Sequence, residues 1–165
     1  MPGVTGLSPR NRMYLDIANR YAAKQSGCSK VTVGAVIVKN YGKPNENIIS
    51  IGTNRAIPDL CLTRGCLRVE LYGDAAKSHR LPSDCRALHS EIDAISKAGQ
   101  DLTGCDIFIT RYPCEACARA IVASGIKTVW FGRGQYISKQ TEQIFDSAKV
   151  EYHWLRDWEE ADRND

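Results

Sequence analysis

Two short motifs in the chain hold residue types that bind zinc. His89 lies two residues before Glu91, and Cys114 lies three residues before Cys117. Zinc prefers nitrogen and sulfur ligands in a tetrahedral arrangement, and a catalytic zinc takes three ligands from the protein and leaves the fourth position open. Cysteines three residues apart in the first turn of a helix share one face, so both sulfurs can reach one ion. We therefore predict a zinc site made by His89, Cys114 and Cys117.

Glu91 is the residue that would make this zinc site catalytic. The order of the motifs, His-x-Glu followed by Pro-Cys-x-x-Cys, is the signature of zinc-dependent base deaminases. Zinc lowers the pKa of a bound water towards neutrality. A carboxylate two residues past His89 can flank that water and move protons. Glu91 is therefore predicted to be the catalytic acid and base: it would take the water proton, hydroxide would attack C4 of a cytosine, and Glu91 would protonate the ring nitrogen and the leaving amine.

Both motifs are predicted to open helices, at 89–98 and 114–124. Other helical patterns begin at Ser8 and at Ser138. Strand patterns of apolar and β-branched residues recur five times, at 31–38, 48–53, 106–110, 127–131 and 150–154. Strands that alternate with helices indicate a layered α/β fold with a largely parallel or mixed sheet.

The first helix has a clear local start signal. Ser8 is predicted as its N-cap and Pro9 as its first residue, and the helix is expected to end near Gly27. Four residues fall on one face of this helix: Met13, Ile17, Tyr21 and Ala22.

The composition is that of an ordinary folded protein. Of the 165 residues, 43% are hydrophobic and 25% are charged. We expect residues 1–165 to form a single deaminase domain with a core from about 10 to 155 and a frayed tail. A net charge of +3 is too small to indicate a nucleic-acid-binding surface. No apolar stretch approaches the roughly 20 residues that span a bilayer, so we expect no membrane partner and a cytoplasmic protein, in the host cytoplasm if a phage encodes it.

Several stretches outside the zinc motifs make the chain resemble the zinc-dependent cytidine and deoxycytidylate deaminase family, and within it the bacterial and phage dCMP deaminases. The likeness runs from about Tyr14 to about Tyr152. Residues 33–38 resemble the first strand of the family, and 52–54 its Gly-x-Asn substrate loop. The cysteine-rich stretch before His89 resembles an insert of the dCMP group, which nucleoside deaminases and tRNA adenosine deaminases do not share.

The resemblance implies a three-layer α/β/α cytidine-deaminase-like fold with a five-stranded mixed sheet. It implies hydrolysis of dCMP to dUMP and ammonia for thymidylate synthesis, regulation by dCTP and dTTP, and a homo-oligomer, commonly a hexamer. By position, Asn54 would contact the sugar or base, and Tyr136 would lie near the phosphate. The alternatives are a turn residue that satisfies its own backbone for Asn54 and a half-buried surface aromatic for Tyr136.

The chain departs from the family pattern close to both motifs. The pattern His-Ala-Glu-x-Asn reads His-Ser-Glu-Ile-Asp at 89–93, so Asp93 adds a charge near the site. The pattern Gly-x-Asn-Gly ends in Arg55, which removes the backbone freedom of glycine. Arg55 is interpreted either as a phosphate contact or as a solvated loop arginine.

Five cysteines lie outside the zinc motif. Cys105 is interpreted as an inert core thiol. The other four lie in a long, irregular segment expected at 55–87 or just before the first predicted strand: Cys28, Cys61, Cys66 and Cys85. Some phage and bacterial relatives hold a second, structural zinc in this region, and four soft ligands would close such a tetrahedral site, with His79 as a substitute for one of them. The alternative is four free, partly buried thiols.

Two other functions stay open from the sequence. One is a zinc deaminase of another cytosine nucleoside or nucleotide, of a purine base, or of a tRNA adenosine, although the last would need a basic surface that a charge of +3 does not indicate. The other is a zinc-stabilised binding module without catalysis. A purely structural site has no use for the Glu91 carboxylate and would prefer a fourth protein ligand.

Overall fold

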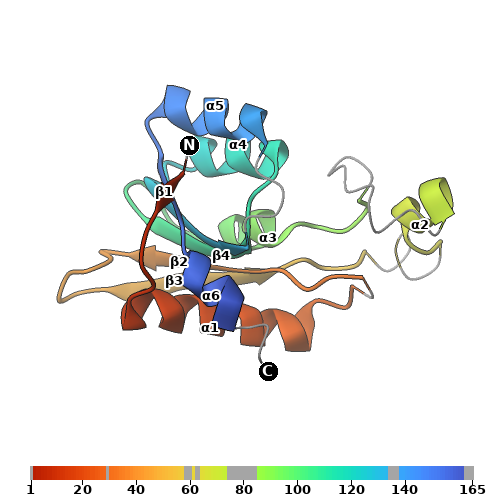
Figure 1. Cartoon of the computed structure of the whole chain (residues 1–165), viewed down its shortest axis with the longest axis horizontal. Helices are drawn as coiled ribbons and strands as arrows, with labels where there is room; N and C mark the ends of the chain where they lie inside the picture. Colours follow the sequence, from red (N-terminus) through yellow and green to blue (C-terminus); the bar gives the residue numbers. More distant parts are fainter. Residues whose placement is uncertain are drawn as a thin grey trace.

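A computed structural model of the chain describes residues 2–28, 30–57, 61, 64–73, 85–133 and 138–161. Within these residues the chain forms one mixed β-sheet with helices on both faces (Figure 1). The strands are β1 (Gly3–Val4), β2 (Gly34–Lys39), β3 (Asn47–Thr53), β4 (Asp106–Arg111), β5 (Thr128–Arg133) and β6 (Glu151–Trp154). The helices are α1 (Pro9–Gln25), α2 (Leu67–Tyr72), α3 (Ser90–Lys97), α4 (Glu115–Ala123), α5 (Lys139–Ala148) and α6 (Arg156–Ala161).

The sheet order is β1-β6-β5-β4-β2-β3, which makes six strands where five were predicted. Strands β4, β5, β6 and β1 run parallel to one another, and β2 is antiparallel to both β4 and β3. The additional strand is β1, which forms only two residue pairs with β6. A strand of two residues leaves no periodic pattern, so the predicted three-layer α/β/α class is confirmed and the predicted strand number is wrong by one.

Successive residues of the central strands point to opposite faces and divide the core into two layers. On β4, Ile107 and Ile109 belong to a core cluster with side chains of α3, α4 and α5. Phe108 belongs to a second cluster with Tyr14 of α1 and Trp158 of α6. Figure 1 shows the same division, with α4 and α5 on one side of the sheet and α1 and α6 on the other.

Helix α1 begins where the sequence predicts but turns a different face to the sheet. The Ser8 hydroxyl accepts a hydrogen bond from the Asn11 N–H at 3.1 Å, which confirms the N-cap. Ala22 is buried, but Met13 is 45% exposed, because the buried stripe runs through Tyr14, Leu15 and Ala18 instead. None of the helices in the described part of the chain is long and apolar enough to cross a membrane.

Two glycines let helices lie directly on the sheet. A Cβ atom on Gly34 would lie 2.0 Å from the carbonyl oxygen of Ala18 in α1. A Cβ atom on Gly52 would lie 2.3 Å from the carbonyl oxygen of Ser90 and 2.4 Å from the N atom of Ala94 in α3. The absence of a side chain at Gly52 therefore sets the distance between β3 and the first turn of α3, where the predicted site begins.

Candidate metal centre

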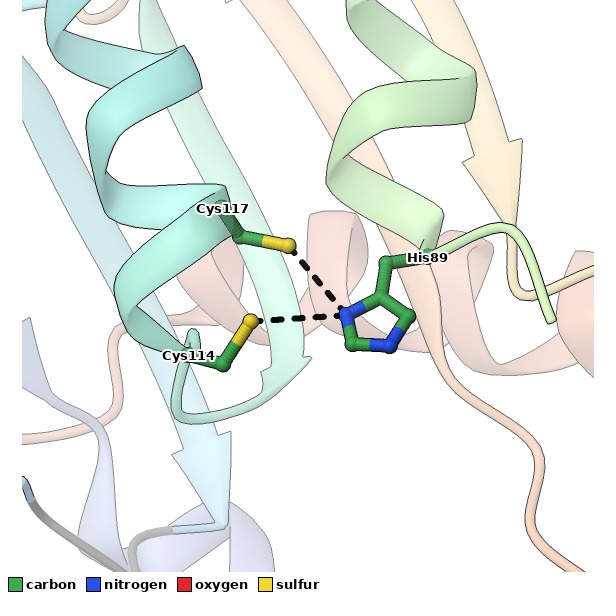
Figure 2. A group of neighbouring side chains, drawn as sticks. All are labelled: His89, Cys114 and Cys117. Carbon is green, nitrogen blue, oxygen red and sulfur yellow. Dashed lines mark hydrogen bonds between the residues drawn. The ribbon is translucent and has the colours of Figure 1, made fainter. Parts of the chain in front are cut away.

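His89, Cys114 and Cys117 come together where the first turns of α3 and α4 meet (Figure 2). His89 is the N-cap of α3, Cys114 is the N-cap of α4, and Cys117 lies in the first turn of α4. Their ligand atoms all lie within 4.8 Å of one another. Of the residues with a described placement, these three form the one group of three or more metal-ligating side chains.

The distances in this group fit a tetrahedral zinc ion. His89 Nδ1 lies 3.5 Å from Cys114 Sγ and 3.3 Å from Cys117 Sγ. Tetrahedral bonds of about 2.3 Å to sulfur and about 2.0 Å to nitrogen would place these atoms roughly 3.5 Å apart. One imidazole and two sulfurs are also the donor types that zinc prefers, so the three residues fit the predicted zinc site.

The protonation equilibria of the three donors are strongly coupled. The hydrogen bond from the Cys117 thiol, followed by that from His89, lowers the pKa of Cys114 to about 4. The hydrogen bond to Cys114 raises the pKa of His89 to about 10, and the pKa of Cys117 is raised for the same reason. This coupling favours the thiolate of Cys114, which is the form of cysteine that binds metal.

Glu91 lies beside this group in the first turn of α3. Its side chain is buried, and Oε2 accepts a hydrogen bond from the Ser90 hydroxyl at 2.9 Å. The carboxyl also hydrogen-bonds the Cys117 thiol. Burial raises the pKa of Glu91. A carboxyl group with a raised pKa next to a metal site can both accept and return a proton.

The second predicted zinc site is not assembled in the described residues. The four cysteines predicted to form it are partly buried and free of disulfides: Cys28, Cys61, Cys66 and Cys85. Among the described residues they form no group of ligand atoms, and the Cys85 thiol instead hydrogen-bonds the side chain of His89. His79 lies outside the described residues. The second zinc stays a prediction.

Asn54 is buried and ties the end of β3 to the segment before β2. Its Oδ1 accepts hydrogen bonds from the Ser26 hydroxyl and the Val33 N–H, and its Nδ2 donates to the carbonyl oxygen of Val31, each at 2.8 Å. The side chain thus satisfies a neighbouring segment of backbone. Its predicted contact with the sugar or base stays a prediction, and Tyr136 lies outside the described residues.

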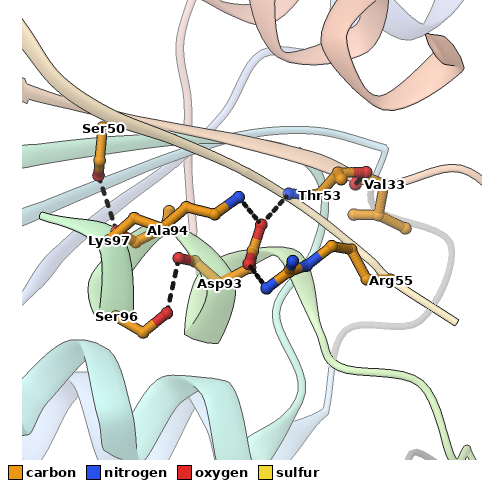
Figure 3. Close-up of polar contacts among 8 residues, drawn as sticks. All are labelled: Val33, Ser50, Thr53, Arg55, Asp93, Ala94, Ser96 and Lys97. Atoms are coloured by element: carbon orange, nitrogen blue, oxygen red, sulfur yellow. Dashed lines mark hydrogen bonds and ion pairs between the residues drawn. The ribbon is translucent and has the colours of Figure 1, made fainter. Parts of the chain in front are cut away.

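Arg55 and Asp93, the two departures from the family pattern, are in contact (Figure 3). Arg55 Nη2 lies 2.6 Å from Asp93 Oδ1, and Lys97 Nζ lies 2.6 Å from Asp93 Oδ2. Asp93 is fully buried, whereas half of the Arg55 side chain is exposed. The sequence alone does not predict this ion cluster, because residues 55 and 93 become neighbours only when α3 packs on β3.

The family model for the cytidine and deoxycytidylate deaminase zinc-binding region matches residues 9–133. The chain is similar to ComE operon protein 2 of Bacillus subtilis, with 29% identity over 142 residues that cover 83% of this chain and 67% of the relative. It is also similar to the deoxycytidylate deaminase of Mycobacterium phage D29, with 33% identity over 125 residues that cover 70% of this chain and 88% of the relative.

The dCMP deaminase of cyanophage S-TIM5, solved in complex with dCMP and dUMP, has a similar fold. It aligns with a TM-score of 0.63 over 90% of this chain and 98% of that chain, and at 22% identity this likeness shows the fold alone. The family match spans most of the chain and includes all three predicted ligands and Glu91. The chain therefore belongs to the cytidine and deoxycytidylate deaminase family of zinc-binding proteins.

Proposed function

We propose that this protein catalyses the hydrolytic deamination of dCMP to dUMP and ammonia, a reaction that supplies dUMP for thymidylate synthesis. The observation that carries the proposal is the buried carboxyl group of Glu91 beside the donor set of His89, Cys114 and Cys117. The choice of dCMP is supported by the phage relative, which is 33% identical and is named deoxycytidylate deaminase.

Different residues of the site have different roles in the reaction. A zinc ion held by the three donors would supply a Lewis acid that makes water acidic enough to attack near neutral pH. Glu91 takes one proton of the attacking water and passes it to the ring nitrogen of cytosine. It then takes the remaining proton of that water, from the hydroxyl group now on C4, and passes it to the amine, which leaves as ammonia while the C4 carbonyl forms. The Ser90 hydroxyl, hydrogen-bonded to Oε2, restricts the rotation of the carboxyl group during these transfers.

A zinc-stabilised binding module without catalysis is the alternative from another class. Such a site would be closed by a fourth protein ligand, whereas the group among the described residues has three members. Burying the Glu91 carboxyl would also cost free energy without any return in a purely structural site. These observations favour a catalytic site over a structural one.

One assay separates these functions. Purified, zinc-loaded protein is given dCMP, deoxycytidine, CMP or dCTP while the loss of cytosine absorbance is followed. We expect the highest kcat/KM with dCMP, and dUMP with ammonia as products. Equal kcat/KM values for dCMP and deoxycytidine would reject the monophosphate substrate but keep deamination. No turnover of any of them by protein with one zinc per chain would favour the binding module, or a deaminase of a purine base or a tRNA adenosine.

The regulation, assembly and location of the protein are further predictions. Regulation by dCTP and dTTP is tested by adding each nucleotide to the same assay. The homohexamer is tested by measuring the mass of the assembly in solution by light scattering. A single domain over 1–165, a cytoplasmic location (the host cytoplasm for a phage protein) and the lack of nucleic-acid or membrane partners stay predictions from the sequence.

A further inference from the structure

An ion cluster forms around the buried carboxylate of Asp93 (Figure 3), two residues beyond Glu91 on α3. It consists of Asp93 with Arg55 on one carboxylate oxygen and Lys97 on the other, both at 2.6 Å. The backbone N–H of Thr53 also donates to Asp93 Oδ2 at 3.1 Å. One carboxylate with two cations leaves an excess of one positive charge beside the site.

The backbone fixes Arg55 next to the metal centre. Arg55 and Leu88 exchange two backbone hydrogen bonds, each of 2.9 Å, and Leu88 directly precedes the ligand His89. The backbone N–H of Asp93 donates to the carbonyl oxygen of His89 at 2.9 Å. Both members of the ion pair are therefore tied to the segment that carries the ligand.

The Arg55 guanidinium keeps donors for a further partner. Its Nη2 lies against Asp93, yet half of its side chain is exposed. A guanidinium group has five N–H donors in a planar fork, so it can pair with a carboxylate and still bind phosphate oxygens. A free arginine would lose rotamer freedom on binding a ligand, whereas the contact with a fully buried carboxylate has already restricted this side chain.

We infer that Asp93 is a positioning residue that holds Arg55 beside the metal centre to bind the 5′-phosphate of the nucleotide, so that the Arg55–Asp93 pair sets the preference for dCMP over deoxycytidine. This inference rests on the proposed function, because it assumes that the cytosine ring occupies the site beside Glu91. The exposed N–H donors of the Arg55 guanidinium complement the charged oxygens of a phosphate group.

The test measures the Kd values of dCMP and deoxycytidine by calorimetry with zinc-loaded protein. All variants carry Glu91→Gln, so that the ligands are not converted during the titration. Arg55→Ala is expected to weaken dCMP binding by about 10- to 100-fold, the factor for losing a charge-assisted hydrogen bond. The Kd of deoxycytidine should stay within about twofold, because the nucleoside has no phosphate to lose.

A double-mutant cycle tests whether Asp93 acts through Arg55. Asp93→Asn keeps an acceptor for the Thr53 N–H but removes the charge, and we expect it to weaken dCMP binding by roughly 3- to 10-fold. The same substitution should have no further effect in the Arg55→Ala background. Lys97→Gln is the matched control: it removes the other cation from the same carboxylate and should leave the ratio of the two Kd values unchanged.

Two results would overturn the inference. One is an equal loss of dCMP and deoxycytidine affinity in Arg55→Ala. The other is an effect of Asp93→Asn that is the same with and without Arg55. Arg55→Ala and Lys97→Gln change exposed side chains. The dCMP and deoxycytidine Kd values of these variants can therefore be compared even if the Asp93 variant does not fold. A lack of dCMP turnover by the unmodified chain, with phosphate-dependent binding intact, would contradict the proposed function and support the inference.

Discussion

Among the described residues, Glu91 has a buried carboxyl group in the first turn of α3, beside the donor set, where the proposed reaction needs an acid and base. In Glu91→Gln the side chain keeps its size and can still accept a hydrogen bond from the Ser90 hydroxyl, but it loses the exchangeable proton. We expect kcat for dCMP to fall by about 10²- to 10⁴-fold, the usual contribution of a positioned acid or base. Rates are measured by product formation, and zinc content by mass spectrometry.

The zinc content of Glu91→Gln shows whether kcat falls because the acid and base is missing or because the metal is missing. The three donors are untouched in Glu91→Gln, so the variant should bind as much zinc as the unmodified protein. A kcat within tenfold of the unmodified value would show that another group moves the proton. A parallel loss of zinc would place Glu91 among the metal ligands and remove its assignment as the acid and base.

Contacts between residues that are close in the chain can be predicted from the sequence, whereas contacts between distant residues cannot. The spacing of Cys114 and Cys117 within one helical turn is a local property, so the metal site could be predicted from sequence. The partner of Asp93 could not, because Arg55 reaches it across a helix–strand interface. The sequence showed two separate departures from a pattern, whereas the structure shows one ion pair.

The same distinction between local and non-local signals holds for the helices and strands. The start of α1 was predicted because the Ser8 cap and Pro9 act within one turn. Strand β1 was missed because its two residues are ordered by pairing with β6, at the other end of the chain. Helix α6 was missed because its anchor, Trp158, is buried against a distant surface made by Gly132 and α1.

The contact between α3 and β3 yields a prediction about how the site is held in place. In Gly52→Ala the new Cβ atom would lie 2.3 Å from the carbonyl oxygen of Ser90, so α3 must move. We expect the free energy of unfolding to fall by about 3 kcal/mol or more, because backbone cannot yield as a side chain does. We also expect kcat to fall, because His89 and Glu91 move with the helix. Urea unfolding and the deamination assay measure the two effects.

Gly6→Ala is the control for this substitution. A Cβ atom on Gly6 would meet no atom within 4 Å, so its unfolding free energy should stay within about 0.5 kcal/mol of the unmodified protein. If Gly52→Ala were equally mild, α3 would not be set by this close approach. The position of the catalytic residues would then depend on other contacts.

Asp106 at the start of β4 gives a pH dependence that is independent of the metal site. Burial raises its pKa, although Trp130 Nε1 donates a hydrogen bond to its carboxylate at 2.7 Å. The folded state therefore holds this proton more tightly than the unfolded chain. The contribution to stability is fully present below the ordinary pKa of aspartate and is lost as the pH rises through the raised folded pKa.

Asp106→Asn should remove the loss of stability that Asp106 causes as the pH rises. The amide oxygen can still accept the hydrogen bond from Trp130, and the side chain carries no charge at any pH. We expect the variant to gain stability relative to the unmodified protein as the pH rises from acid towards neutral, in urea unfolding curves measured at a series of pH values. A difference that is constant with pH would mean that the Asp106 pKa is the same in the folded and unfolded chains.

Across the whole molecule, the metal centre joins the starts of α3 and α4, two helices that follow different strands in the chain. His89 precedes α3, which packs on β3 and β2, whereas Cys114 and Cys117 belong to α4, which follows β4 and packs on α5. A bound ion would therefore cross-link the antiparallel end of the sheet to the parallel end. Any ligand that binds only the folded state adds its binding free energy to stability.

Removing zinc should consequently lower the melting temperature of the whole chain. With free zinc about 100-fold above its Kd, binding adds about 2.7 kcal/mol. For a chain of this size about 1 kcal/mol corresponds to roughly 2–4 °C, so a chelator should lower Tm by roughly 5–11 °C. Scanning calorimetry with and without the chelator measures this shift. Cys114→Ser should bind less zinc and show a smaller shift.

The same experiment decides between one zinc and two. If the cysteines at 28, 61, 66 and 85 hold a second ion, the unmodified protein binds two zinc per chain, and Cys114→Ser keeps one together with part of the chelator effect. If they are free thiols, Cys114→Ser has no bound zinc, and the chelator does not change its Tm. Cys66→Ser affects only the second site. It should therefore lose the second zinc, if there is one, and keep the zinc held by His89, Cys114 and Cys117. Cys105→Ala, a substitution of a buried thiol outside both cysteine sets, should change Tm without changing its response to the chelator.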